Sequence, residues 1–282
     1  MTIPNFPPRY DAHQHFWRYD PVAHGWMNGR MTGIQRDFLP TDLAPLLAAQ
    51  GFAGCVAVQA SQTLGETRWL LELADRHSFI RGVVGWVDLR SPDVRDQLAQ
   101  FARHPRLKGV RHVVQDEPDV DFMRGAEFQR GIAALQEFGL TYDLLLFPKH
   151  LPVAVDLVRR FPALTFVVDH LAKPLIAQEV LEPWASDLKA LAALPNVTCK
   201  LSGLVTEADW VTWTPAHLEP YLDEALAAFG PQRLMIGSDW PVCILAGSYG
   251  RVMDAVQAWV ARLGEADRNA ILGGNCARVY KL

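Results

Sequence analysis

The chain has 282 residues, of which 50% are hydrophobic and 21% are charged, a composition typical of a globular protein with a sizeable core. Its formal net charge is −4 and it has no long basic cluster, so we expect no nucleic-acid partner. No run of about 18 apolar residues predicts a membrane span. The first ten residues lack the apolar core of a signal peptide, and the four cysteines form no Cys-x-x-Cys pair. We therefore expect a cytoplasmic protein with reduced thiols.

Short β-branched runs alternate with segments of helical periodicity along the whole chain. The expected strands are residues 9–13, 54–60, 80–87, 107–113, 140–146, 164–170, 197–201 and 233–237. Between them, helical periodicity is clearest over residues 67–77, 93–103, 126–138, 152–161, 184–194 and 215–229. This alternation of strands and helices predicts repeated βα units.

Eight such units in 282 residues predict a single-domain (β/α)8 TIM barrel, for which about 250 residues is typical. Strand segments such as 55–58 and 165–168 are apolar on both faces, as expected of parallel strands covered by helices. A doubly wound open sheet is the alternative. It would show a glycine-rich phosphate-binding turn after the first strand, and residues 11–15 (Asp-Ala-His-Gln-His) form no such turn.

The connection over residues 16–39 is unusually long for a βα loop and contains three glycines and two tryptophans. Long loops in compact domains are often functional covers. We expect a lid over the substrate, and the alternative is a structured segment that plugs the barrel.

In a barrel of this kind, the active site is built at the C-terminal ends of the strands. His13 and His15 lie two residues apart on the first strand, so their side chains point the same way. We expect them to converge with His170, at the end of the sixth strand, and Asp239, just after the eighth. Imidazole nitrogens and a carboxylate are typical zinc ligands, so these four residues predict a site for one divalent ion. Without a metal, the same groups would bind a developing oxyanion.

Further polar residues lie near other strand ends. Arg111 and His112 are adjacent, so a regular strand would point only one of them inward, but we expect both near the site. Lys200 lies near the end of an apolar strand, where it either polarises a carbonyl or forms a structural salt bridge. Asp143 presents the same alternatives, of which we favour the structural one, and the role of His150 stays open.

Three tryptophans flank these polar groups and are expected to form pocket walls for a ring-shaped substrate, which Arg111 also binds. They are Trp17, Trp86 and Trp240. No Gly-x-Ser-x-Gly turn is present, and no cysteine has a histidine partner nearby in sequence, so a covalent nucleophile is disfavoured. We expect Asp239 to act as general base for water attack. The predicted catalytic residues are Asp239, His170, Arg111, His112 and Lys200.

Together, residues 11–17, 169–174, 200–204, 237–241 and 274–280 make the chain resemble the sugar-lactonase branch of the amidohydrolase superfamily. The resemblance implies hydrolysis of a γ- or δ-lactone of a sugar acid, such as L-fuconolactone. It also implies that His13, His15 and His170 are metal ligands or carbonyl binders.

The chain departs from binuclear members of the superfamily, which have a modified lysine or a glutamate where this chain has Arg111 and His112. We therefore expect one metal ion, such as zinc, or none. A metal-dependent non-oxidative decarboxylase of the same superfamily is the alternative activity, and a barrel that only binds its ligand is disfavoured because the four site residues occur together. The sequence makes no prediction of oligomeric state.

Overall fold

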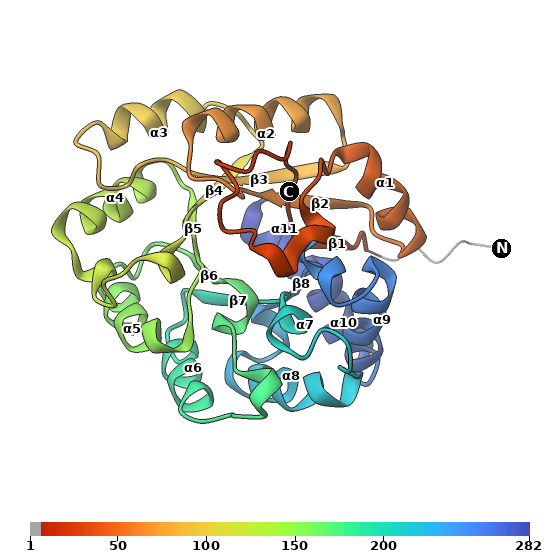
Figure 1. Ribbon diagram of the computed structural model, residues 1–282. Helices are drawn as coiled ribbons and strands as arrows, with labels where there is room; N and C mark the ends of the chain where they lie inside the picture. The colour runs from red at the N-terminus through yellow and green to blue at the C-terminus, as the bar shows by residue number, and fades with distance from the viewer. Residues whose placement is uncertain (1–6) are drawn as a thin grey trace.

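The computed structural model describes residues 7–282 and shows eight parallel strands arranged in the order β1 to β8, surrounded by helices (Figure 1). This confirms the predicted (β/α)8 barrel. Each observed strand overlaps its predicted segment, although β6 ends at Val168, two residues earlier than predicted. The strands are β1 (Tyr10–Gln14), β2 (Gly54–Val58), β3 (Ile80–Gly85), β4 (Leu107–His112), β5 (Thr141–Leu144), β6 (Phe166–Val168), β7 (Val197–Leu201) and β8 (Leu234–Ile236).

Each of the six segments with clear helical periodicity forms a helix, and five further helices (α1, α7, α9, α10 and α11) are present among the described residues. They form where an apolar stripe can pack on the barrel, as in α5, which buries six of its ten residues. The helices are α1 (Pro40–Ala49), α2 (Leu64–Arg76), α3 (Val94–Ala102), α4 (Ala126–Glu137), α5 (Leu151–Arg160), α6 (Trp184–Ala192), α7 (Leu204–Glu207), α8 (Pro215–Phe229), α9 (Tyr249–Val260), α10 (Glu265–Asn269) and α11 (Asn275–Tyr280). None of those described is both long and apolar enough to cross a membrane.

The barrel is closed by contacts between β1 and the segment that follows β8. The backbone N–H of Asp239 donates to the carbonyl of His13 at 2.8 Å, and the N–H of His15 donates to the carbonyl of Trp240 at 2.6 Å. These two hydrogen bonds bring both histidines of β1 directly beside Asp239.

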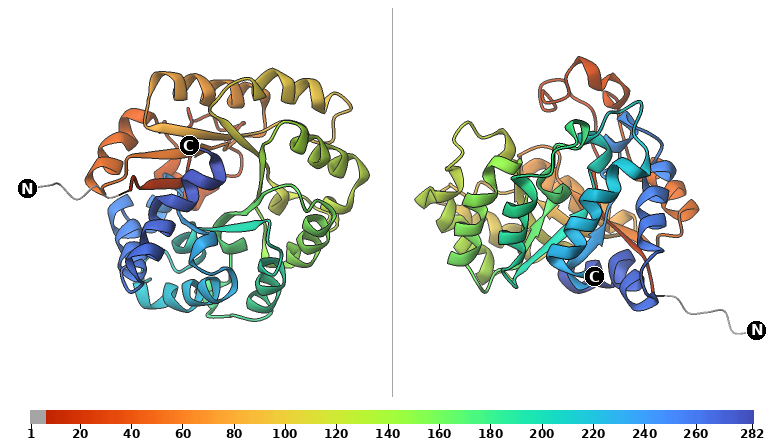
Figure 2. Two further views of the ribbon diagram at one scale, coloured as in Figure 1. Left: turned by 180° about the vertical axis from the view of Figure 1, so that it is seen from behind. Right: turned by 90° about the horizontal axis from the view of Figure 1, so that it is seen from below.

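Different parts of the chain lie over the two ends of the barrel. Figure 2 shows residues 16–39 and the C-terminus at opposite ends of the molecule. At the C-terminal end of the chain, Cys276, Val279 and Tyr280 of α11 pack against buried strand residues that include Tyr10 and Val56. The strand C-termini are left for the site, beneath the segment 16–39.

That segment folds back on itself. Trp17 and Phe38 form an antiparallel bridge at its base, and residues Gly29–Ile34 form a 3-10 helix within it. Its role as a lid stays a prediction.

Candidate active site

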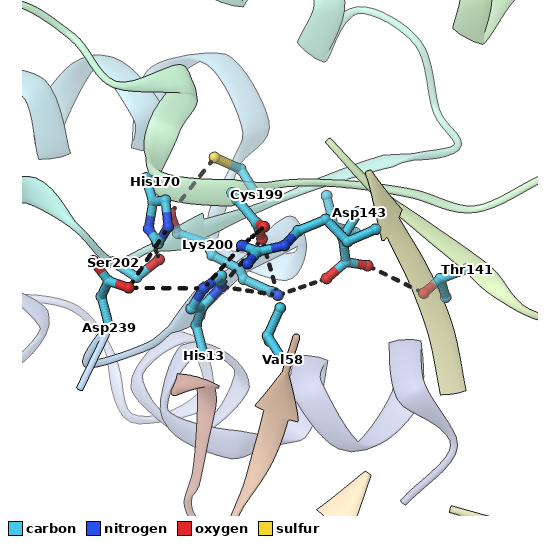
Figure 3. A network of polar contacts seen from close by, with 12 residues as sticks. His13, Val58, Thr141, Asp143, His170, Cys199, Lys200, Ser202 and Asp239 are labelled. Carbon is cyan, nitrogen blue, oxygen red and sulfur yellow. Dashed lines mark hydrogen bonds and ion pairs between the residues drawn. The ribbon is translucent and has the colours of Figure 1, made fainter. Parts of the chain in front are cut away.

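Three predicted ligands meet at the C-terminal end of the barrel. One ligand atom from each of His13, His170 and Asp239 lies within 4.8 Å of the other two (Figure 3). The Nε2 atoms of His13 and His170 are each 3.8 Å from Asp239 Oδ1. His15 joins the group from the side, with its Nε2 3.2 Å from both Asp239 Oδ1 and His13 Nε2.

The backbone takes an uncommon conformation to aim two of these side chains. His170 and Asp239 have φ angles of 54° and 58°, in the left-handed region that non-glycine residues rarely adopt. For His170 this is the start of a left-handed turn that runs through Lys173. Such strain is typical of functional sites, because the surrounding structure must hold the residue in place.

Two glycines make room for the imidazole rings. A Cβ on Gly203 would lie 2.4 Å from Nδ1 of His170, and a Cβ on Gly237 would lie 2.8 Å from Cβ of His13. Gly203 also has a φ of +65°. Any side chain at these positions would displace a histidine.

The protonation states suit metal binding. His15 Nδ1 donates to the carbonyl of Val58 at 2.8 Å, which leaves the Nε2 lone pair facing Asp239. Burial lowers the pKa of His13 well below its usual value and that of His170 to about 4. Burial opposes ionisation of Asp239, but the neighbouring histidines outweigh it and lower its pKa. Metal ligands must be neutral imidazoles and carboxylates, so these residues fit a divalent cation.

Behind His13 lies a buried ion-pair network centred on Asp169, which was not among the predicted site residues. Asp169 Oδ2 is 3.0 Å from Arg111 Nη1, and its Oδ1 is 3.2 Å from His13 Nδ1 and 3.0 Å from Lys200 Nζ. Burial opposes ionisation of Asp169, but the charges of Lys200 and Arg111 hold its pKa well below its usual value. Asp169 therefore anchors both Arg111 and His13.

Lys200 is fully buried below the site and does not line the cavity. Its Nζ is 2.6 Å from Asp143 Oδ2, which also accepts a hydrogen bond from Tyr280 at 2.6 Å. Of the two predicted alternatives for Lys200 and Asp143, this geometry matches the structural salt bridge. Tyr280 also links the network to α11.

A cavity of about 610 Å³ opens above the donor cluster. Its lining comes from the segments after every strand except β3. The predicted site residues that line it are His15, Arg111, His170 and Asp239.

The remaining predicted residues lie elsewhere. His112 points away from the barrel interior, as strand alternation requires of a neighbour of Arg111, and its Nε2 is 2.6 Å from Glu117 Oε1. Trp86 follows β3 and its indole N–H donates to His112 at 3.4 Å. Trp17 and Trp240 are buried against Phe38 at the base of the segment 16–39. None of these tryptophans lines the cavity.

His150, whose role the sequence left open, is buried at the end of the 3-10 turn Pro148–His150, and its Nδ1 accepts a hydrogen bond from the backbone N–H of Phe147 at 3.1 Å. This contact holds the short turn that leads into α5.

The cavity walls instead contain residues that were not predicted from the sequence. Trp26 comes from the segment 16–39 and Trp210 from the connection after α7. Lys173 and Glu207 form an ion pair at 3.4 Å, and burial raises the pKa of Glu207, to which the charge of Asp239 contributes. Lys173 could have been predicted, because it lies three residues after His170 in the segment 169–174, which was already linked to the site.

A parallel eight-stranded barrel with a His, His, Asp cluster at its strand C-termini defines an enzyme of the TIM-barrel class. The sequence matches the amidohydrolase family over residues 10–282, and the chain belongs to that family. This confirms the family that its motifs resemble.

Two relatives are similar over nearly their whole length. An L-fucono-1,5-lactonase of Burkholderia multivorans is 47% identical, over 97% of this chain and 96% of the relative. An L-fucono-1,5-lactonase of Burkholderia ambifaria is 42% identical with the same coverage. The solved structure of an amidohydrolase from Burkholderia multivorans with bound zinc matches with a TM-score of 0.95 and 46% identity, over 98% of this chain and 100% of that one.

Proposed function

We propose that the protein hydrolyses a sugar-acid lactone, with L-fucono-1,5-lactone as the first candidate. The observation that carries the proposal is the position of Asp239, an ionised carboxylate in the cavity wall surrounded by imidazole nitrogens. The two L-fucono-1,5-lactonases at 42% and 47% identity support the substrate class.

Asp239 accepts a proton from water, which attacks the lactone carbonyl carbon. Arg111 lines the cavity and its guanidinium is fixed by Asp169 and Gln59, so it is placed to stabilise the oxyanion that develops on the carbonyl oxygen. The carbon–oxygen bond of the ring then breaks, and the leaving ring oxygen takes up a proton.

Glu207 is a second carboxyl in the cavity wall, and it forms an ion pair with Lys173 at 3.4 Å. The proton for the leaving ring oxygen comes from Asp239, which has just accepted it from the attacking water and now returns it.

His13, His170 and Asp239 would hold a divalent ion, with His15 beside them, and zinc suits this donor set. When bound, the ion supplies Lewis-acid polarisation of the carbonyl and lowers the pKa of bound water. Zinc titrated into metal-free protein should bind at one ion per chain. Asp239→Asn should weaken binding at least tenfold, because it removes the charged ligand.

The activity is tested with a panel of 1,4- and 1,5-lactones of sugar acids and a pH indicator, with and without chelator. We expect ring opening of L-fucono-1,5-lactone and a loss of at least about 100-fold in kcat for Asp239→Asn. Unchanged hydrolysis by that variant would remove the assignment of the base. No activity on any lactone would reject the proposed function.

The decarboxylase alternative has less support. Decarboxylases of solved structure match with TM-scores of 0.67 to 0.68 at 12% to 15% identity, a likeness that shows the fold alone. Carbon dioxide release from an aromatic acid, strictly dependent on metal, would restore that alternative.

A further inference from the structure

The charges of the cavity wall restrict the substrate. Two cationic side chains line it, and both are already paired: Arg111 with Asp169 at 3.0 Å and Lys173 with Glu207 at 3.4 Å. Three acidic side chains line the same cavity, namely Asp116, Glu207 and Asp239. A carboxylate on the substrate would find both cationic side chains of this wall already paired and would lie near these acidic side chains.

One neutral polar side chain in the wall, that of Gln115, has an oxygen without a partner among the described residues. Gln115 lies in the 3-10 turn Val114–Asp116 directly after β4, and its backbone N–H donates to Leu145 at 3.1 Å. Its side-chain Oε1 is buried and has no hydrogen-bond donor within residues 7–282. Buried polar atoms are nearly always paired, so this amide calls for a partner from outside the chain.

The chemistry of a lactone shows what that partner is. The carbonyl and ring oxygens of a lactone only accept hydrogen bonds, so they cannot serve Oε1. A ring hydroxyl both donates and accepts, and it would satisfy the amide of Gln115 in either orientation. The aromatic rings of Trp26 and Trp210 in the same wall suit the apolar faces of a sugar ring.

Resting on the proposed lactonase function, we infer that Gln115 is a specificity-determining residue that receives a hydroxyl of an uncharged sugar lactone. The paired cations exclude lactones that carry a free carboxylate in addition to the lactone ring. A site that hydrogen-bonds a substrate hydroxyl rejects the analogue without it, because its own polar group is then left unpaired.

The experiment measures kcat/KM for a sugar lactone and for analogues that each lack one hydroxyl. Wild type is compared with Gln115→Leu, which keeps a similar volume. Gln62→Leu is the matched control, because Gln62 lines the same cavity but its Oε1 already accepts from Val113 N–H at 2.9 Å. Chemical denaturation of each variant separates folding from recognition.

We expect Gln115→Leu to lose about 10- to 100-fold on the parent lactone. For the one analogue that lacks the hydroxyl received by Gln115, the kcat/KM of Gln115→Leu should equal that of wild type. Gln62→Leu should change kcat/KM by the same factor for every substrate. If Gln115→Leu also changed kcat/KM by the same factor for every substrate, the inference would be overturned, while the proposed lactonase activity would stand.

The charge argument is tested on wild type with a lactone of the same ring stereochemistry that carries a carboxylate at its terminal carbon. We expect kcat/KM at least tenfold below that of the neutral lactone. Equal values would overturn the exclusion of charged lactones. Failure of wild type to open any lactone would reject the proposed function itself, so the two failures are distinguishable.

Discussion

Arg111 and Asp169 form an ion pair of 3.0 Å behind the cavity, and both side chains are almost completely buried. The same carboxylate also contacts Lys200 and His13. Asp169→Asn removes the negative charge that Arg111 and Lys200 share. Breaking a buried pair typically costs about 3–5 kcal/mol. We expect the free energy of unfolding to fall by an amount in this range, measured by urea denaturation, and kcat/KM to fall as Arg111 loses its anchor.

The control for this variant is Glu137→Gln. Glu137 pairs with Arg95 at 2.7 Å, but both side chains are about half exposed. Surface pairs of this kind contribute little to stability, so this variant should unfold like wild type. An Asp169→Asn protein as stable as the control would contradict the role given to the buried pair.

Gly203→Ala tests the close packing against His170. The new Cβ would lie 2.4 Å from the imidazole, and φ is +65°. Gly51→Ala is the matched control, because Gly51 has a φ of +73° but no atom within 4 Å of an added Cβ. The left-handed conformation costs alanine about 1–2 kcal/mol at either position. Only Gly203→Ala should also lower kcat, by about tenfold or more as His170 moves. Equal kcat values for the two variants would show that the ring tolerates displacement.

Strand periodicity accounts for what the sequence could predict of this site. Because side chains alternate on a strand, His13 and His15 were expected to share a direction, and their Nε2 atoms lie 3.2 Å apart. The same rule points only one of Arg111 and His112 inward; we expected both near the site, but of the two only Arg111 lines the cavity.

Asp169 was missed for a reason that the same rule explains. On a regular strand it would face away from its neighbour His170. However, β6 ends at Val168, and the left-handed turn at His170 lets both side chains reach the site. A positive φ at a non-glycine residue has only a weak sequence signature, an enrichment of Asn, Asp and His, since it is imposed by the surrounding structure.

The positions of the tryptophans could not be predicted because they depend on loop paths. Trp86 lies in the segment after β3, which takes no part in the cavity, whereas Trp26 reaches the wall from the middle of a long loop. Strand periodicity says nothing about either path.

The pH dependence of stability follows from the lowered pKa of His170. Its value in the folded protein is about 4, against an ordinary value of 6.5. Between these values the unfolded chain binds a proton that the folded protein does not. The stability of wild type should therefore fall relative to His170→Asn as the pH drops from 6.5 to about 4, by roughly 3 kcal/mol in total.

This difference is measured by urea denaturation of metal-free protein over that pH range. Comparison with the variant cancels the titration of groups remote from His170, because these groups are common to both proteins. The kcat/KM of wild type should decline as the pH passes below about 4. A stability difference between the two proteins that is the same at pH 7 and pH 4.5 would contradict the buried, neutral state of His170.

The predicted lid is tested by the contact that joins it to the opposite wall. The guanidinium carbon of Arg30, in the segment 16–39, lies 4.9 Å from the ring centroid of Trp210. Arg36 stacks on Phe38 at 3.9 Å within the same segment and serves as the control. If the segment is a lid, Arg30→Ala removes a cation–π contact that favours closure and should raise KM about two- to fivefold with little change in kcat. Hydrogen exchange over residues 16–39 should rise in Arg30→Ala more than in Arg36→Ala. Equal effects of the two variants on KM and on exchange would instead support a fixed plug.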